Sequence, residues 1–154
     1  MKLLSNIKYY LTNRATHHVY QSVIQPGIKY NCITNLKLTQ TQKQKLKSLD
    51  TRASNLVDGL KVNTMDTLNK HAGILVRKCI DGNVCTNFLN YFERNNHQKV
   101  TRNNNFLLKV PKVKLEFAKR SFYFMGVQLY NSLPIEIRQA KDDFKKQLKS
   151  FQFH

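Results

Sequence analysis

The sequence predicts a mainly α fold, a small helical assembly with a short extended segment near residues 106–116. Apolar residues recur at steps of three and four in several stretches, which is the spacing of one helix face. Residues that cap or end helices stand at the borders of those stretches. A chain of 154 residues is also long enough to bury one ordinary hydrophobic core, whereas two cores are not expected.

Two helices are predicted within the first 60 residues. The first is expected to end at Pro26-Gly27, and its apolar face consists of Val19, Tyr20, Val23 and Ile24. The second can begin at Thr39 or Thr41, whose side chains accept backbone amides, and is expected to end near Gly59. Its apolar face is formed by Leu46, Leu49, Ala53, Leu56 and Leu60.

A third helix is predicted from Thr64 to Asp81-Gly82, with Thr64 as its N-cap and Asp66 as an acid in the first turn. Its apolar stripe comprises Leu68, Ala72, Leu75, Val76 and Cys79. The stretch Val84–Phe92 is expected to add a short helix with Phe88, Leu89 and Phe92 on its inner side.

The polar stretch Glu93–Asn105 predicts a loop. Around Pro111, short extended pieces are expected from alternating Leu108, Val110, Val113 and Leu115. The last third predicts helix again, interrupted by Pro134 and with Asp142-Asp143 in front of its final turns. The apolar faces there are Phe122, Met125, Leu129 and Leu133, and then Phe144, Leu148 and Phe151.

Charge is the strongest signal in the composition, because 26 Lys and Arg against 9 Asp and Glu give a formal net charge of +17. Clustered cations that meet a polyphosphate release its condensed counterions, so such a chain is expected to bind RNA, DNA or both. The sign of the charge does not distinguish the two nucleic acids.

One stretch holds the densest group of cations and is interrupted by a single acid, Glu116. The aromatic residues Phe117, Phe122 and Tyr123 lie within or beside it, and no base-reading motif is present. We therefore predict contact with the phosphate backbone by Lys99, Arg102, Lys109, Lys112, Lys114, Lys119 and Arg120.

Catalytic and metal-binding motifs are not supported by the residue spacing. The adjacent pair His17-His18 points in two directions on a helix, and Cys79 fits a small core residue better than a nucleophile. Asp142-Asp143 precedes a helix, whereas polymerase aspartates stand on a tight turn between strands. The sequence therefore predicts no enzymatic activity, metal, cofactor or small-molecule substrate.

The expected location is intracellular, in the nucleus or cytoplasm. Three cysteines, with no sign of an oxidising compartment, suit a reduced protein, and neither a secretory signal nor a membrane span is predicted. No acid precedes Asp50, and acid-poor N-termini occur in mitochondrial transit peptides, so a mitochondrial location stays open.

A longer pattern carries a family resemblance. The stretch Lys119–Arg138, KRSFYFMGVQLYNSLPIEIR, resembles the region near the C-terminus of reverse transcriptases of non-long-terminal-repeat retrotransposons, the jockey-like LINE elements. HHVYQSVIQPGIKYN at residues 17–31 and KLKSLDTRASNLVDG at residues 45–59 resemble helices of the same family. Tyr130 stands where the family commonly has Trp. The resemblance gives structural roles to Phe122, Tyr123, Gly126, Tyr130, Asn131, Leu133 and Pro134.

The resemblance implies a thumb-like helical segment at residues 1–60 and a C-terminal post-polymerase segment at residues 61–154, either as one cooperative unit or as an incomplete fragment. Asn131 is expected to cap the turn at Pro134. Because the catalytic palm has no counterpart, the implied protein is a catalytically inactive C-terminal fragment of an RNA-directed DNA polymerase. Its partners would be nucleic acid and possibly the missing upstream polymerase region.

Two alternatives stay open. The chain can be an independent basic nucleic-acid-binding protein of an organelle or the cytosol. It can equally be an orphaned fragment that has no function alone.

Overall fold

The computed structural model describes residues 6, 8–30, 38–57, 62–84, 91–95, 106–140 and 142–153. Within these ranges the regular elements are helices, and the predicted mainly α fold class is confirmed. The chain divides into two compact units, Met1–Leu68 and Asn69–His154. The predicted division at residue 60 into thumb-like and post-polymerase segments stays a prediction.

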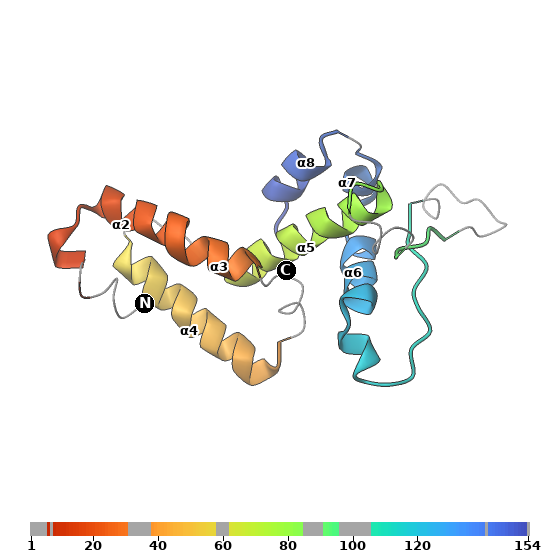
Figure 1. Cartoon of the computed structure of the whole chain (residues 1–154), viewed down its shortest axis with the longest axis horizontal. Coiled ribbons are helices and arrows are strands. Elements are labelled where there is room, and N and C mark those ends of the chain that lie inside the picture. Colours follow the sequence, from red (N-terminus) through yellow and green to blue (C-terminus); the bar gives the residue numbers. More distant parts are fainter. Residues whose placement is uncertain are drawn as a thin grey trace. The chain divides into compact units, whose positions relative to one another are not determined.

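The first unit begins with a nearly continuous helical run. A short 3-10 turn, η1 (Lys8–Tyr10), precedes α2 (Asn13–Val19), a π-helical turn η2 (Tyr20–Ile24) and α3 (Gln25–Tyr30), and Figure 1 draws the last three as one coiled ribbon. Thr12 caps the start of α2, since its hydroxyl accepts a hydrogen bond from the amide of Ala15 at 3.2 Å.

The prediction that this helix ends at Pro26-Gly27 was wrong, because α3 continues to Tyr30. A proline inside a helix lacks a donor, and its ring presses on the carbonyl four residues earlier. Here the wider π turn directly precedes it, and the amide of Gln25 reaches back five residues to the carbonyl of Tyr20. We attribute the continuation to this wider turn, which gives the proline ring room.

Helix α4 (Gln40–Leu56) starts at a capping box. The hydroxyl of Thr39 accepts from the amide of Gln42, and the Gln42 side chain accepts from the amide of Thr39 at 2.8 Å. The start therefore matches the first of the two predicted caps. The helix ends at Leu56, before the expected end at Gly59, and residues 58–61 lie outside the described ranges.

The core of the first unit lies where α4 packs beside η2. Tyr20, Ala53 and Val57 are buried there, with half-buried Val19, Ile24, Leu56 and Val62 against them. Leu49, predicted on the apolar face of α4, is instead 43% exposed. The next residue, Asp50, makes a polar contact within this unit. Its carboxylate accepts hydrogen bonds from both the amide and the hydroxyl of the buried Thr64.

Helix α5 (Thr64–Ile80) follows the predicted stripe, with Leu68, Ala72, Val76 and Cys79 all buried. It ends where expected, since Gly82 adopts the left-handed conformation at φ 74°. Its N-cap differs from the prediction: the Asn63 side chain accepts from the amide of Asp66 at 3.1 Å, while Thr64 is bonded to Asp50.

The second unit packs the remainder of α5 against three shorter helices, α6 (Phe122–Asn131), α7 (Ile135–Gln139) and α8 (Phe144–Ser150). A 3-10 turn, η5 (Ala118–Arg120), leads into α6, whose N-cap Ser121 accepts from the amide of Phe124. The buried residues contributed by the three helices and the turn between α6 and α7 include Phe122, Val127, Tyr130, Leu133, Ile137, Phe144 and Leu148. Phe122, Leu133, Phe144 and Leu148 were predicted there, whereas the predicted Met125, Leu129 and Phe151 are only half-buried.

The remaining predicted elements lie partly outside the described ranges. Of the short helix expected at residues 84–92, residues 85–90 lie outside the described ranges, and Tyr91 and Phe92 form a bend. The loop expected at residues 93–105 is described only to Asn95, where Arg94 forms an isolated antiparallel bridge with Leu108. From Lys109 to Lys114 the backbone has no regular structure, and Figure 1 draws neither a helix nor an arrow there.

Candidate nucleic-acid interface

The candidate interface is the segment Lys109–Arg120, which we call the basic segment. Its N-terminal end is fixed to the core of the second unit through Leu108, whose side chain is only 2% exposed. The amide of Lys109 donates to the carbonyl of Glu93 at 2.8 Å, and the amide of Asn95 donates to the carbonyl of Leu107 at 2.9 Å. This short ladder holds the segment at its first residue.

Asn131 completes that attachment from α6. Its side-chain oxygen accepts from the amide of Leu108, and its side-chain nitrogen donates to the carbonyl of Leu108, both at 2.9 Å. The prediction that Asn131 caps the turn at Pro134 was therefore wrong. A buried backbone segment needs partners for both polar groups, and one amide side chain supplies both.

Two of the predicted phosphate-binding cations are engaged by acids. Lys109 lies 3.0 Å from Glu93, a contact that raises the pKa of Lys109, and Lys119 pairs with Glu116 within η5 and its preceding turn. Both pairs are largely exposed, so each is worth little and can be exchanged for a phosphate contact.

Three other cations, Lys112, Lys114 and Arg120, are exposed, and none of them takes part in an ion pair between residues that the structure describes. Lys99 and Arg102, the remaining predicted members, lie outside the described ranges. Five of the predicted cations therefore lie on this short segment, and three of them have no carboxylate partner among the residues that the structure describes.

Arg94 is a cation that sequence reasoning did not include. It is exposed, and its backbone bridges to Leu108 at the base of the basic segment. Its position depends on an antiparallel pairing across a stretch that the sequence presented as a loop. The only available signal was its charge, which many other residues of this chain share.

The residues to which the family resemblance gives structural roles, between Phe122 and Pro134, pack within the second unit. A Cβ added to Gly126 would lie 3.0 Å from Cγ2 of Val76 and 3.2 Å from Cζ of Phe92, so α6 packs closely there. The rings of Phe122 and Tyr123 contact that of Phe92, with centroids 5.7 and 5.9 Å away. Leu133 is buried, and Pro134 stands at the N-cap of α7.

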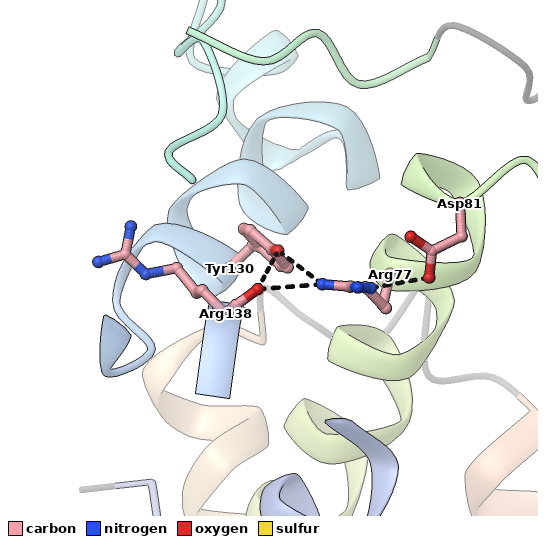
Figure 2. Close-up of polar contacts among 4 residues, drawn as sticks. All are labelled: Arg77, Asp81, Tyr130 and Arg138. Carbon is pink, nitrogen blue, oxygen red and sulfur yellow. Dashed lines mark hydrogen bonds and ion pairs between the residues drawn. The ribbon is translucent and has the colours of Figure 1, made fainter. Parts of the chain in front are cut away.

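Figure 2 shows how Tyr130 joins three helices through Arg77. The guanidinium of Arg77 donates to Asp81 at 2.7 Å and to the carbonyl of Arg138 at 3.0 Å, and it approaches the Tyr130 hydroxyl at 3.5 Å. It also lies over the ring of Phe144, 5.3 Å from the centroid. Burial lowers the pKa of Arg77, but the hydrogen bonds to Asp81 and Tyr130 outweigh it and raise that pKa overall.

Arg138 contributes its backbone carbonyl to this cluster, whereas its guanidinium points away from Arg77 in Figure 2, and only 8% of the residue is exposed. Its Nε donates to the carbonyl of Leu133 at 3.0 Å, while one terminal nitrogen finds no hydrogen-bond partner among the described residues. The cluster around Arg77 and Arg138 ties the turn after α6 to α5. We interpret it as structural, since the guanidinium of Arg77 is bonded to Asp81 and to the carbonyl of Arg138.

Two further findings concern sites elsewhere. Among the described residues, no group of three or more His, Cys, Asp or Glu side chains could hold a metal ion. Within the same ranges, no helix has both the length and the apolar character needed to cross a membrane.

Comparison with protein-family models, with curated proteins and with solved structures gives no match to this chain.

Proposed function

We propose that the chain is a catalytically inactive C-terminal fragment of a non-long-terminal-repeat retrotransposon reverse transcriptase, and that its remaining function is sequence-tolerant binding of nucleic acid through the phosphate backbone. One observation carries the binding part of the proposal. Lys112, Lys114 and Arg120 are exposed on one short segment without a carboxylate partner among the described residues.

Electrostatics favour phosphate as the missing partner. Like charges close together on a chain of net charge +17 repel one another, and this repulsion is relieved when a polyanion binds. Each phosphate that a cation neutralises releases condensed counterions, which supplies free energy without any contact to a base. The segment contains no arrangement that reads base edges, so the proposed binding tolerates any sequence.

The family resemblance of the phrase Lys119–Arg138 supports the proposed origin. Gly126, Tyr130 and Asn131 have distinct packing or hydrogen-bonding roles in the second unit, so a change at any of them would disturb its packing. Such constraints give a physical reason for the phrase to persist in a diverged copy. The proposed partners are RNA or DNA and the upstream polymerase region, and a nuclear or cytoplasmic location would suit that function.

The test is binding of the purified chain to RNA–DNA hybrid, duplex DNA and single strands over a series of salt concentrations. The proposal expects the logarithm of affinity to fall linearly with the logarithm of salt concentration. The slope should correspond to several phosphates neutralised by the chain. Tighter binding of the hybrid would favour the reverse-transcriptase origin over an independent binding protein. Absent or salt-independent binding would contradict the proposed function and favour an orphaned fragment.

A fluorescent fusion separates the alternatives on location. Signal in the nucleus or cytoplasm agrees with the proposal. Import into mitochondria would instead favour the independent organellar protein.

A further inference from the structure

The basic segment carries an aromatic side chain that phosphate binding does not use. Phe117 is 86% exposed, and its neighbour Leu115 is 72% exposed. A phenylalanine in this position forgoes the stabilisation that burial of its ring would give. An exposed ring beside cations that form no ion pair within the described ranges calls for an explanation beyond charge.

The ring stands on a fixed piece of backbone. Phe117 occupies the N-cap position of η5, and its carbonyl accepts from the amide of Arg120 at 3.0 Å. The carbonyl of Leu115 accepts from the amide of Lys119 at 3.2 Å, and η5 continues directly into α6 through its cap Ser121. Phe117 is therefore held one turn from Arg120 and at the entrance to a packed helix.

The two lysines before the ring are exposed. Exposure alternates along Val110–Lys114, so that Lys112 and Lys114 are exposed while Pro111 and Val113 are half-buried. Residues two positions apart lie at most about 7 Å apart, because even a fully extended chain spans no more than about 3.3–3.6 Å per residue. The two ammonium groups are therefore close enough for both to contact the backbone of one nucleic-acid strand.

We propose that the basic segment binds unpaired nucleic acid, with Lys112, Lys114 and Arg120 on phosphates of one strand and the ring of Phe117 stacked on a base. This inference rests on the proposed function and adds the class of nucleic acid. Bases inside a duplex have both faces covered by their neighbours, whereas an unpaired base has a face free for an aromatic side chain. Stacking is indifferent to base identity, in keeping with sequence-tolerant binding.

The first measurement uses the absence of tryptophan from this chain. The variant Phe117→Trp places a single fluorescent indole at the proposed stacking position, and Leu115→Trp places one at a neighbouring exposed position as the matched control. A single-stranded DNA oligonucleotide is expected to quench the fluorescence of Phe117→Trp strongly and that of Leu115→Trp weakly. An abasic strand of equal length, which retains its phosphates, is expected to quench neither.

The second measurement compares affinities of the full chain for the same two strands. Phe117→Ala is expected to weaken binding of the intact strand by about fivefold to a hundredfold, the usual range for one base–aromatic stack, and to leave binding of the abasic strand unchanged. Leu115→Ala is expected to change neither affinity. Both side chains are exposed, so neither variant disturbs the core.

The outcomes separate this inference from the proposed function. Salt-dependent binding of both strands, with equal affinities for wild type and Phe117→Ala, would overturn base stacking while leaving phosphate binding intact. The exposed ring would then be assigned to contact with a protein partner instead. Equal losses in Phe117→Ala and Leu115→Ala would also overturn it, because they would indicate a general apolar contact. Failure of wild type to bind either strand would contradict the proposed function itself.

Discussion

Replacing Asn131 by alanine tests how the basic segment is attached to the second unit. The change removes two hydrogen bonds of 2.9 Å and leaves the amide and carbonyl of Leu108 without those partners in a residue that is 2% exposed. An unsatisfied buried polar group costs about 1–3 kcal/mol. Because water can reach part of the opened site, we expect a total loss of about 2–4 kcal/mol.

Amide hydrogen exchange, followed by NMR, measures this directly at Leu108. A loss of about 2–4 kcal/mol corresponds to roughly 30- to 1000-fold faster exchange of its amide. Gln128→Ala is the matched control, since Gln128 is exposed on the same helix and should change exchange little. Asn131→Ala should also weaken binding of nucleic acid, because the segment must then be ordered at the cost of conformational entropy. Equal exchange of the Leu108 amide in the two variants would refute this reasoning.

Three further predictions concern stability within each unit. Gly126→Ala should lose up to about 2 kcal/mol of stability in chemical denaturation, since overpacking of about 1–3 kcal/mol opposes a helix-propensity gain of about 1 kcal/mol, whereas Gly27→Ala, with open space around it, should stabilise. Burial, and then the charge of Asp50, raises the pKa of Tyr20 above 10.0, so stability should fall as pH rises from there through the folded pKa; Tyr20→Phe should lessen that alkaline loss in thermal melts. Thr39→Ala should cost about 1 kcal/mol in helical stability by circular dichroism, because it removes the capping box of α4.

Elements with a strong local signal could be predicted from the sequence. The stripe from Leu68 to Cys79 and the stop at Gly82 lie within one helix, where apolar spacing and a left-handed residue are sufficient. The capping box at Thr39 is equally local, because its two partners are three residues apart.

The errors arose where a neighbouring turn or a distant residue decides the structure. From the sequence, Pro26 predicts the end of a helix, because the residues Tyr20–Ile24 contain no pattern that predicts the π turn before it. Thr64 reads as an N-cap, but its hydroxyl is taken by Asp50, which lies fourteen residues earlier in the chain. A local irregularity of the helix decides the first case, and a tertiary contact overrides local propensity in the second.

The candidate interface could be predicted in outline but not in detail. Composition alone indicated the cations of the basic segment, yet their availability depends on Glu93 and Glu116, which engage Lys109 and Lys119. The anchor between Asn131 and Leu108 spans 23 positions, and an asparagine beside Ser-Leu-Pro favours a turn cap when only neighbours are considered. Such pairings become visible only in the folded chain.

The most direct test of phosphate binding by the basic segment compares two triple variants with the same change in net charge. The first variant removes the cations that form no ion pair among the described residues, and it is Lys112→Ala/Lys114→Ala/Arg120→Ala. The second removes three exposed lysines of α8 in the same unit, and it is Lys145→Ala/Lys146→Ala/Lys149→Ala. With single-stranded oligonucleotide, the first variant should flatten the slope of log affinity against log salt concentration by about 2, from about 0.7 for each lost phosphate contact, and the second should leave it near the wild-type value. Equal flattening in both variants would show that net charge alone drives binding and would contradict the assignment of the interface to the basic segment.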